Sequence, residues 1–137
     1  MKRTILAVAV IMAMATTLSF GQTAKPTLSL KYVAAQEALA ADNFAQAKAA
    51  LADLAKESQG DVKIKAQAAA GAADIAGMRK AFKPLSEALV KMNIPAGYTV
   101  AFCPMFEKGS PWIQKKDGKI ANPYFGKAML TCGEFRN

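Results

Sequence analysis

Residues 75–92 read IAGMRKAFKPLSEALVKM, and the apolar side chains in this stretch recur every three or four residues. They are Ile75, Met78, Phe82, Leu85, Leu89 and Met92. This is the period of an α-helix, so the stretch predicts a long amphipathic helix. Pro84 falls inside the stripe and removes one backbone hydrogen bond, but the stripe keeps its phase on both sides. We therefore expect a kinked helix, or two nearly collinear helices, rather than a reversal of the chain.

Two more helices are predicted upstream of this stretch. Apolar residues recur at helical spacing over residues 28–39 and again over residues 44–54, with the polar residues 42–43 between them. These segments are expected to form two antiparallel helices. The long helix is then expected to begin near Asp61, which can cap its N-terminus.

The C-terminal residues 97–137 differ from the Ala-rich residues 22–96, because they hold most of the aromatic residues together with Gly and Pro. Residues 98–103 alternate as a strand does, and the pair Asp117-Gly118 favours a tight hairpin. Short strands and loops are therefore expected after a helical part. The predicted fold is all-α: an up-and-down bundle of three to four helices with a small hairpin or irregular C-terminal cap.

The first residues have the pattern of a secretory signal peptide. Two basic residues precede the apolar run 5–15, and Ser19 and Gly21 supply the small residues expected before a cleavage site. The run is too short to span a bilayer, and an uncleaved N-terminal anchor helix is the alternative. We expect residues 1–21 to be removed and residues 22–137 to form a single domain that is periplasmic or otherwise exported and not membrane-spanning.

The composition excludes several kinds of chemistry. The 137 residues contain no His, so no Ser-His-Asp relay, imidazole base or His-based zinc site can form. The net charge of +8 comes from scattered Lys and Arg residues, and no predicted helix carries a basic face interleaved with aromatics. An enzyme would have to use Cys103 without a His base or a CxxC partner. We therefore expect neither an enzyme nor a protein that binds nucleic acid.

Two sulfur pairs stand out in the C-terminal segment. Cys103 and Met105 flank Pro104, and Met129 and Cys132 lie three residues apart, on one side of an expected helical turn. If the hairpin expected at Asp117-Gly118 folds the chain back, up to two thiolates and two thioethers meet at one point. Cu(I) and Ag(I) prefer sulfur to oxygen and tolerate low coordination numbers. The candidate metal ligands are therefore Cys103, Met105, Met129 and Cys132.

The alternative is a disulfide between Cys103 and Cys132, because two cysteines in an exported protein usually form one. Such a bond would stabilise a small domain by about 3 kcal/mol in the loop-entropy model. In that case Met105 and Met129 pack against aromatic side chains, and the protein is a disulfide-stapled interaction module of the cell envelope. The two interpretations are compatible if a reversible disulfide controls access to the metal ligands.

The order of residue types in this segment resembles a family signature. It consists of CPM at 103–105, W at 112, NPYFG at 122–126, ML at 129–130 and CG at 132–133. The signature is similar to that of a small exported bacterial domain family of unknown function, which occurs alone or fused to periplasmic adaptor subunits of copper- and silver-type heavy-metal efflux pumps. Residues 79–89 also resemble the helix that precedes this signature. One departure is at residues 113–114, where this chain has Ile-Gln in place of Leu-Ser.

The resemblance implies a helical bundle with a sulfur-bearing cap and a role in metal handling in the envelope. Carried over by position, it favours the four sulfur residues as metal ligands over the stapled module. We therefore expect an exported protein that binds Cu(I) or Ag(I) and is linked to metal efflux or homeostasis. The expected partners are the soft metal ion and an efflux adaptor or another envelope protein.

Overall fold

The computed structural model describes residues 29–136, so the expected signal peptide at residues 1–21 lies outside the described part of the chain. Within residues 29–136 the elements are α1 (Leu30–Ala40), α2 (Phe44–Glu57), α3 (Gly60–Ala70), α4 (Ile75–Leu89), β1 (Tyr98–Cys103), β2 (Ser110–Lys115), the 3₁₀ turn η1 (Gly126–Met129) and β3 (Glu134–Arg136). The three strands form one sheet. The fold is therefore α+β, and the expected all-α bundle is wrong.

The first two helices begin and end close to where the apolar spacing predicts them. The side chain of Ser29 caps α1 by accepting a hydrogen bond from the N–H of Lys31. Asn43 caps α2 in the same way, accepting from the N–H of Gln46 at 3.1 Å. Polar residues with oxygen acceptors are favoured at these positions because the first N–H groups of a helix lack partners in the helix. The two-helix prediction is confirmed.

The long helix predicted from Asp61 onward is two helices. The α3 helix ends at Ala70, and α4 begins at Ile75, where Asp74 accepts a hydrogen bond from the N–H of Gly77 at 2.7 Å. Asp61 lies in the first turn of α3 and pairs with Lys65 rather than capping the helix. The reversal therefore lies upstream of the apolar stripe, in residues 71–74. Pro84 lies inside α4, which continues past it as predicted.

The sheet has the order β2-β1-β3, and both pairings are antiparallel. Val100 of β1 lies opposite Ile113 of β2, and Phe102 lies opposite Glu134 of β3. The strand predicted at residues 98–103 is confirmed. It finds partners on both sides, and this pairing turns the expected irregular cap into a sheet.

The hairpin predicted around Asp117-Gly118 is wrong, because β2 pairs with β1 and not with the residues that follow it. The side chain of Gln114 takes the place of a partner strand. Its amide donates to the carbonyl of Lys119 at 2.8 Å, and its oxygen accepts from the N–H of Ala121 at 3.0 Å. These bonds satisfy backbone groups that a hairpin would otherwise pair.

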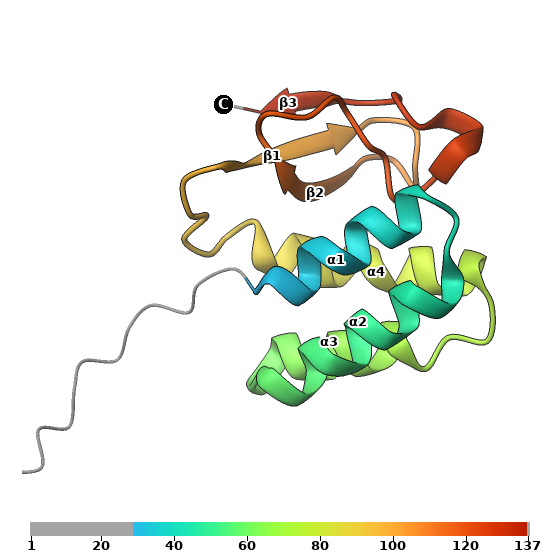
Figure 1. Ribbon diagram of the computed structural model, residues 1–137, viewed down its shortest axis with the longest axis vertical. Coiled ribbons are helices and arrows are strands. Elements are labelled where there is room, and N and C mark those ends of the chain that lie inside the picture. Colours follow the sequence, from blue (N-terminus) through green and yellow to red (C-terminus); the bar gives the residue numbers. More distant parts are fainter. Residues whose placement is uncertain (1–28, 137) are drawn as a thin grey trace, which may run out of the picture.

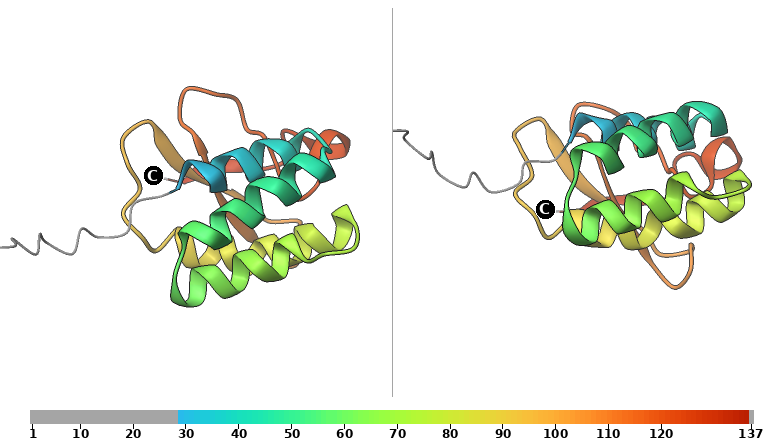
Figure 2. Two further views of the ribbon diagram at one scale, coloured as in Figure 1. Left: turned by 60° about the horizontal axis from the view of Figure 1, so that its bottom comes forward. Right: turned by 90° about the horizontal axis from the view of Figure 1, so that it is seen from below.

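The elements are arranged in layers. Figure 1 shows the sheet on one side of α1 and α4, with α2 and α3 on the side away from it. Figure 2 gives the view from the helical side, in which neighbouring helices lie side by side and the C-terminal elements lie behind them. None of the helices in residues 29–136 has the length and apolar character needed to cross a membrane.

Aromatic side chains join the helices to the sheet. Tyr32 of α1 stacks on Phe82 of α4 with ring centroids 5.0 Å apart, and Phe82 also contacts Tyr124 at 6.1 Å. Tyr124 in turn meets the edge of Trp112 on β2 at 6.0 Å. All four side chains are buried in one continuous hydrophobic core that draws on both the helical residues and the C-terminal segment. Helices and sheet therefore stabilise each other.

Candidate functional site

The two cysteines meet at one end of the sheet. Cys103 is the last residue of β1, and Cys132 lies just before β3, the strand that pairs with β1. Their Sγ atoms are 3.3 Å apart, and both residues are free thiols. In the sequence, a meeting of the two cysteines is expected only if a hairpin at Asp117-Gly118 folds the chain back; the two thiols meet although that hairpin does not form. The cause is the pairing of β1 with β3, not a hairpin at Asp117-Gly118.

Cys103 lies in an environment that favours its thiolate form. Burial raises the pKa of this thiol, but hydrogen bonds from Cys132, from the backbone N–H groups of Met105 and Phe106 and from the side chain of Asn122 outweigh burial. The pKa of Cys103 is therefore lower than that of an ordinary thiol. The hydrogen bond with Cys103 raises the pKa of Cys132, and burial and the negative charge of Cys103 raise it further. The contact therefore favours the thiolate form at Cys103 and the thiol form at Cys132.

Asn122 fixes the backbone that carries Cys132. Its amide donates to the carbonyl of Cys132 at 2.6 Å, and its side-chain oxygen accepts from the N–H groups of Tyr124 at 2.8 Å and Phe125 at 3.2 Å. The side chain is fully buried. The sequence pattern does not reveal this contact, because it joins residues ten positions apart.

Gly133 lets the segment after Cys132 approach β1 closely. A Cβ atom at this position would lie 2.7 Å from Cη2 of Trp112 and 2.9 Å from the carbonyl oxygen of Phe102. The backbone also has φ +141°, which side chains with a Cβ rarely adopt. The CG pair of the sequence signature therefore places a thiol next to a residue that must be small.

The two methionines are close to the cysteines in the sequence, but their side chains are exposed to solvent. Met105 follows Cys103 by two residues and is 63% exposed, while Met129 is 37% exposed. The N–H of Cys132 donates to the carbonyl of Met129 at 3.0 Å, which closes the turn predicted for this segment. Leu130 and Phe135 are also exposed nearby in sequence. The structure thus brings the two thiols into contact and leaves both thioethers at the surface.

The donor set at this site suits a soft metal ion better than a hard one. Among residues 29–136, no group of three or more Cys, Asp, Glu or His side chains is placed to hold a metal ion. A metal at the thiol pair would therefore have two thiolates as its charged ligands. Two-coordinate binding is acceptable to Cu(I) and Ag(I), whereas Zn(II) requires four ligands of N, O or thiolate type.

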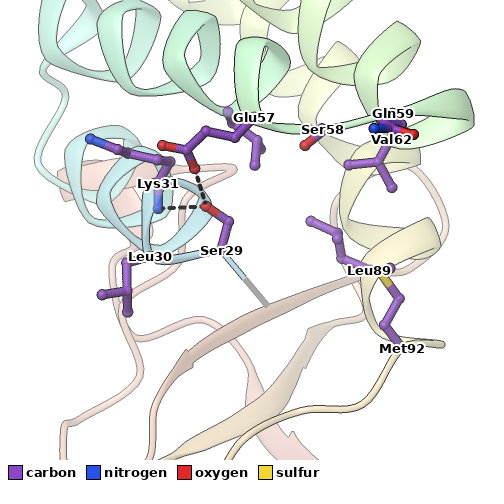
Figure 3. Close-up of a pocket in the computed structure, with 10 residues that line it drawn as sticks. Ser29, Leu30, Lys31, Glu57, Ser58, Gln59, Val62, Leu89 and Met92 are labelled. Atoms are coloured by element: carbon purple, nitrogen blue, oxygen red, sulfur yellow. Dashed lines mark hydrogen bonds between the residues drawn. The ribbon is translucent and has the colours of Figure 1, made fainter. Parts of the chain in front are cut away.

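A separate hollow of about 810 Å³ lies in the helical layer (Figure 3). It is lined by Ser29, Leu30, Lys31, Leu54, Glu57, Ser58, Gln59, Val62, Leu89 and Met92. At its rim, Ser29 donates a hydrogen bond to the carboxylate of Glu57 at 3.2 Å. Leu54 and Leu89 are only 1% and 3% exposed, so little of their surface is open to a ligand. None of the four sulfur ligand candidates lines this hollow.

Comparisons with protein-family models, with curated proteins and with solved structures found no match for this chain. The likeness of the C-terminal signature to the envelope domain family therefore stays a prediction, and so do the metal, the partners and the location that it implies.

Proposed function

We propose that this protein binds one soft monovalent metal ion, Cu(I) or Ag(I), through the thiolates of Cys103 and Cys132. The observation that carries the proposal is the 3.3 Å contact between the two sulfur atoms. The two residues are 29 positions apart in the sequence, one at the end of β1 and the other just before β3, the strand that pairs with β1. The fold already holds the two sulfur ligands together, so the metal ion does not have to bring them together when it binds. The loss of conformational entropy on binding is therefore smaller.

The protonation of the pair also supports this proposal. A metal-bound cysteine is a thiolate, so a metal ion has to displace the thiol protons. The pKa of Cys103 is already lowered by its hydrogen bonds, and the thiol of Cys132 is the group from which a bound cation would remove a proton. Exposed Met105 and Met129 are the thioethers nearest in sequence that could complete the coordination.

The proposed setting is the periplasm or another exported location, with a role in metal efflux or homeostasis. It rests on the signal-peptide pattern of residues 1–21 and on the resemblance of the C-terminal signature to the envelope family. An efflux adaptor or another envelope protein would deliver or receive the ion. The proposal includes no catalysed reaction.

The test is native mass spectrometry of the reduced protein after incubation with Cu(I), in the wild type and in C103S and C132S. We expect the wild type to take up one Cu(I) and each serine variant to lose tight binding. L130A is the matched control, because Leu130 is exposed beside Met129 but supplies no donor atom. Equal uptake by the wild type and both serine variants would overturn the proposal.

A disulfide-stapled interaction module is the second candidate, and the exposed apolar side chains around the pair favour it. Met105, Met129, Leu130 and Phe135 are all more than a third exposed. In this case oxidised wild-type protein should melt at a higher temperature than C132S, and Cu(I) should not bind. Thermal unfolding with and without Cu(I) separates this function from metal binding, because only a metal-binding protein is stabilised by the ion.

A further inference from the structure

The two cysteines of the pair differ in their exposure to solvent. Cys103 has no exposed surface, whereas Cys132 is partly exposed. They nevertheless lie 3.3 Å apart, so any group bound to Cys132 is within reach of Cys103. A reagent from solution can therefore reach only one member of a pair whose members are in contact.

The surroundings of each thiol explain this difference. Cys103 ends β1, the central strand of the sheet, and belongs to the continuous hydrophobic core. Cys132 lies in the segment between η1 and β3. Met129, the last residue of η1, is 37% exposed. The segment is held by the bond from Asn122 to the carbonyl of Cys132 at 2.6 Å. The backbone of Cys132 is thus fixed while the residue remains partly exposed.

We propose that the pair undergoes ordered thiol–disulfide exchange with external disulfides, in which Cys132 reacts first and Cys103 completes the reaction. The thiol of Cys132 gives up its proton, and the resulting thiolate attacks one sulfur of a disulfide RSSR, forms a mixed disulfide and releases RS⁻, which takes up that proton. The thiolate of Cys103 then attacks the Cys132 sulfur, forms the Cys103–Cys132 bond and releases the second RS⁻. Two electrons and two protons pass from the protein to RSSR, which becomes two RSH.

This inference does not depend on metal binding, because the exchange requires only the access and the contact of the two thiols. The co-reactant is a low-molecular-weight disulfide or an exposed protein disulfide. The same order applies in reverse: an external thiolate reaches the oxidised pair only at Cys132 and releases Cys103. Cys132 is therefore both the entry and the exit point for electrons.

The test uses reduced, metal-free protein and glutathione disulfide, with acid quenching and mass spectrometry. Wild-type protein should lose two hydrogen masses without accumulating a glutathione adduct. C103S should accumulate one stable adduct at Cys132, because the resolving thiol is missing. In the folded state, C132S should react with glutathione disulfide far more slowly than C103S. In denaturant the two variants should react equally fast, which would show that the fold protects Cys103 from the reagent.

A second measurement on the wild type avoids any effect of the substitutions on folding. Reduced protein treated briefly with substoichiometric iodoacetamide should carry the label on Cys132 and not on Cys103 after peptide mapping. Preferential labelling of Cys103, or a stable glutathione adduct on the wild type, would overturn the proposed order. Neither readout involves a metal, so a failure here is distinguishable from a failure to bind Cu(I).

Discussion

Arg79 of α4 and Asp42, in the turn between α1 and α2, form an ion pair with 2.6 Å between Nη2 and Oδ1. The same guanidinium donates to the backbone carbonyls of Leu39 and Pro123, each at 2.9 Å. The second oxygen of Asp42 accepts from the N–H of Lys127 at 3.3 Å. One arginine therefore ties together the α1–α2 turn, α4 and the C-terminal segment that leads to Cys132.

The first prediction is that R79A destabilises the protein by about 2 kcal/mol, because it removes three hydrogen bonds made by a largely buried guanidinium, including the one to the carbonyl of Pro123. Urea unfolding followed by circular dichroism measures this. K80A is the control, since Lys80 is the next residue on α4 and is exposed. Equal stability of the two variants would contradict the role given to Arg79.

The same variant should alter the response to acid. The hydrogen bond from Arg79 holds the pKa of Asp42 below its ordinary value of 3.8. A lowered carboxyl pKa contributes stability that is present above the ordinary value and is lost as the pH falls through the folded-state value. Wild-type protein should therefore lose more stability than R79A on acidification, and denaturant titrations at several acidic pH values measure the difference.

The second prediction concerns the contact between α1 and the sheet. The hydroxyl of Tyr32 accepts from the N–H of Ile113 at 3.2 Å and lies 2.7 Å from the hydroxyl of Ser86, and Tyr32 is fully buried. Y32F leaves the N–H of Ile113 without its partner, so we expect a loss of about 2 kcal/mol in the free energy of unfolding. Y98F, at a partly exposed tyrosine, is the control. Denaturant unfolding is the measurement, and a Y32F variant as stable as Y98F would disprove the proposed contact.

The third prediction is that G133A weakens Cu(I) binding as well as stability. Its Cβ would collide with Trp112 and with the backbone of Phe102, which would push Cys132 away from Cys103. G97A is a matched control, because Gly97 also has positive φ but would place its Cβ in open space. Both variants should lose about 1 kcal/mol or more from backbone strain. Only G133A should also lose affinity in a Cu(I) competition titration, and equal affinities would argue against the close approach at Gly133.

Two helices, the apolar stripe of α4 and one strand of this fold could be predicted from local spacing, whereas the division between α3 and α4 and the sheet could not. The strand at 98–103 has alternating side chains, which is a local signal, whereas β3 has only three residues and owes its existence to its pairing with β1. The spacing does not predict the break at residues 71–74, because the Ala-rich sequence before it has no clear apolar face. The pairing of β3 with β1 is a long-range contact, and such a contact leaves no periodic pattern in three residues.

At the candidate site, too, local sequence predicts one part and only the fold supplies the other. The two cysteines stand out by residue type and compartment, and their meeting could be expected if the chain folds back. The contacts that hold them could not be foreseen. Asn122 and Gly133 look like ordinary turn residues in the sequence, and only the fold places them against the carbonyl of Cys132 and the ring of Trp112.

The fourth prediction is that Cu(I) affinity rises with pH. Metal binding requires both thiolates, and the pKa of Cys103 is lowered while that of Cys132 is raised. At a pH between the pKa of Cys103 and the pKa of Cys132, Cu(I) displaces only the proton of Cys132. The affinity for Cu(I) should therefore rise about tenfold per pH unit in this range. Below the pKa of Cys103 two protons compete, and the dependence should become steeper. Competition with a chromophoric Cu(I) chelator of known pH dependence measures this, and an affinity that stays constant across neutral pH would exclude thiolate ligands.

The fifth prediction connects the metal site to the exchange reaction. Sulfur atoms joined in a disulfide carry no negative charge, so the oxidised Cys103–Cys132 pair should not bind Cu(I) tightly. Protein oxidised with glutathione disulfide should take up no ion in native mass spectrometry, and it should regain one after reduction with dithiothreitol and removal of the reductant. The double variant M105L/M129L serves as the control: its reduced form should still bind through the thiols, with affinity lowered by whatever the thioethers contribute. Tight Cu(I) binding by the oxidised wild type that disappears in the oxidised double variant would instead assign the ion to Met105 and Met129.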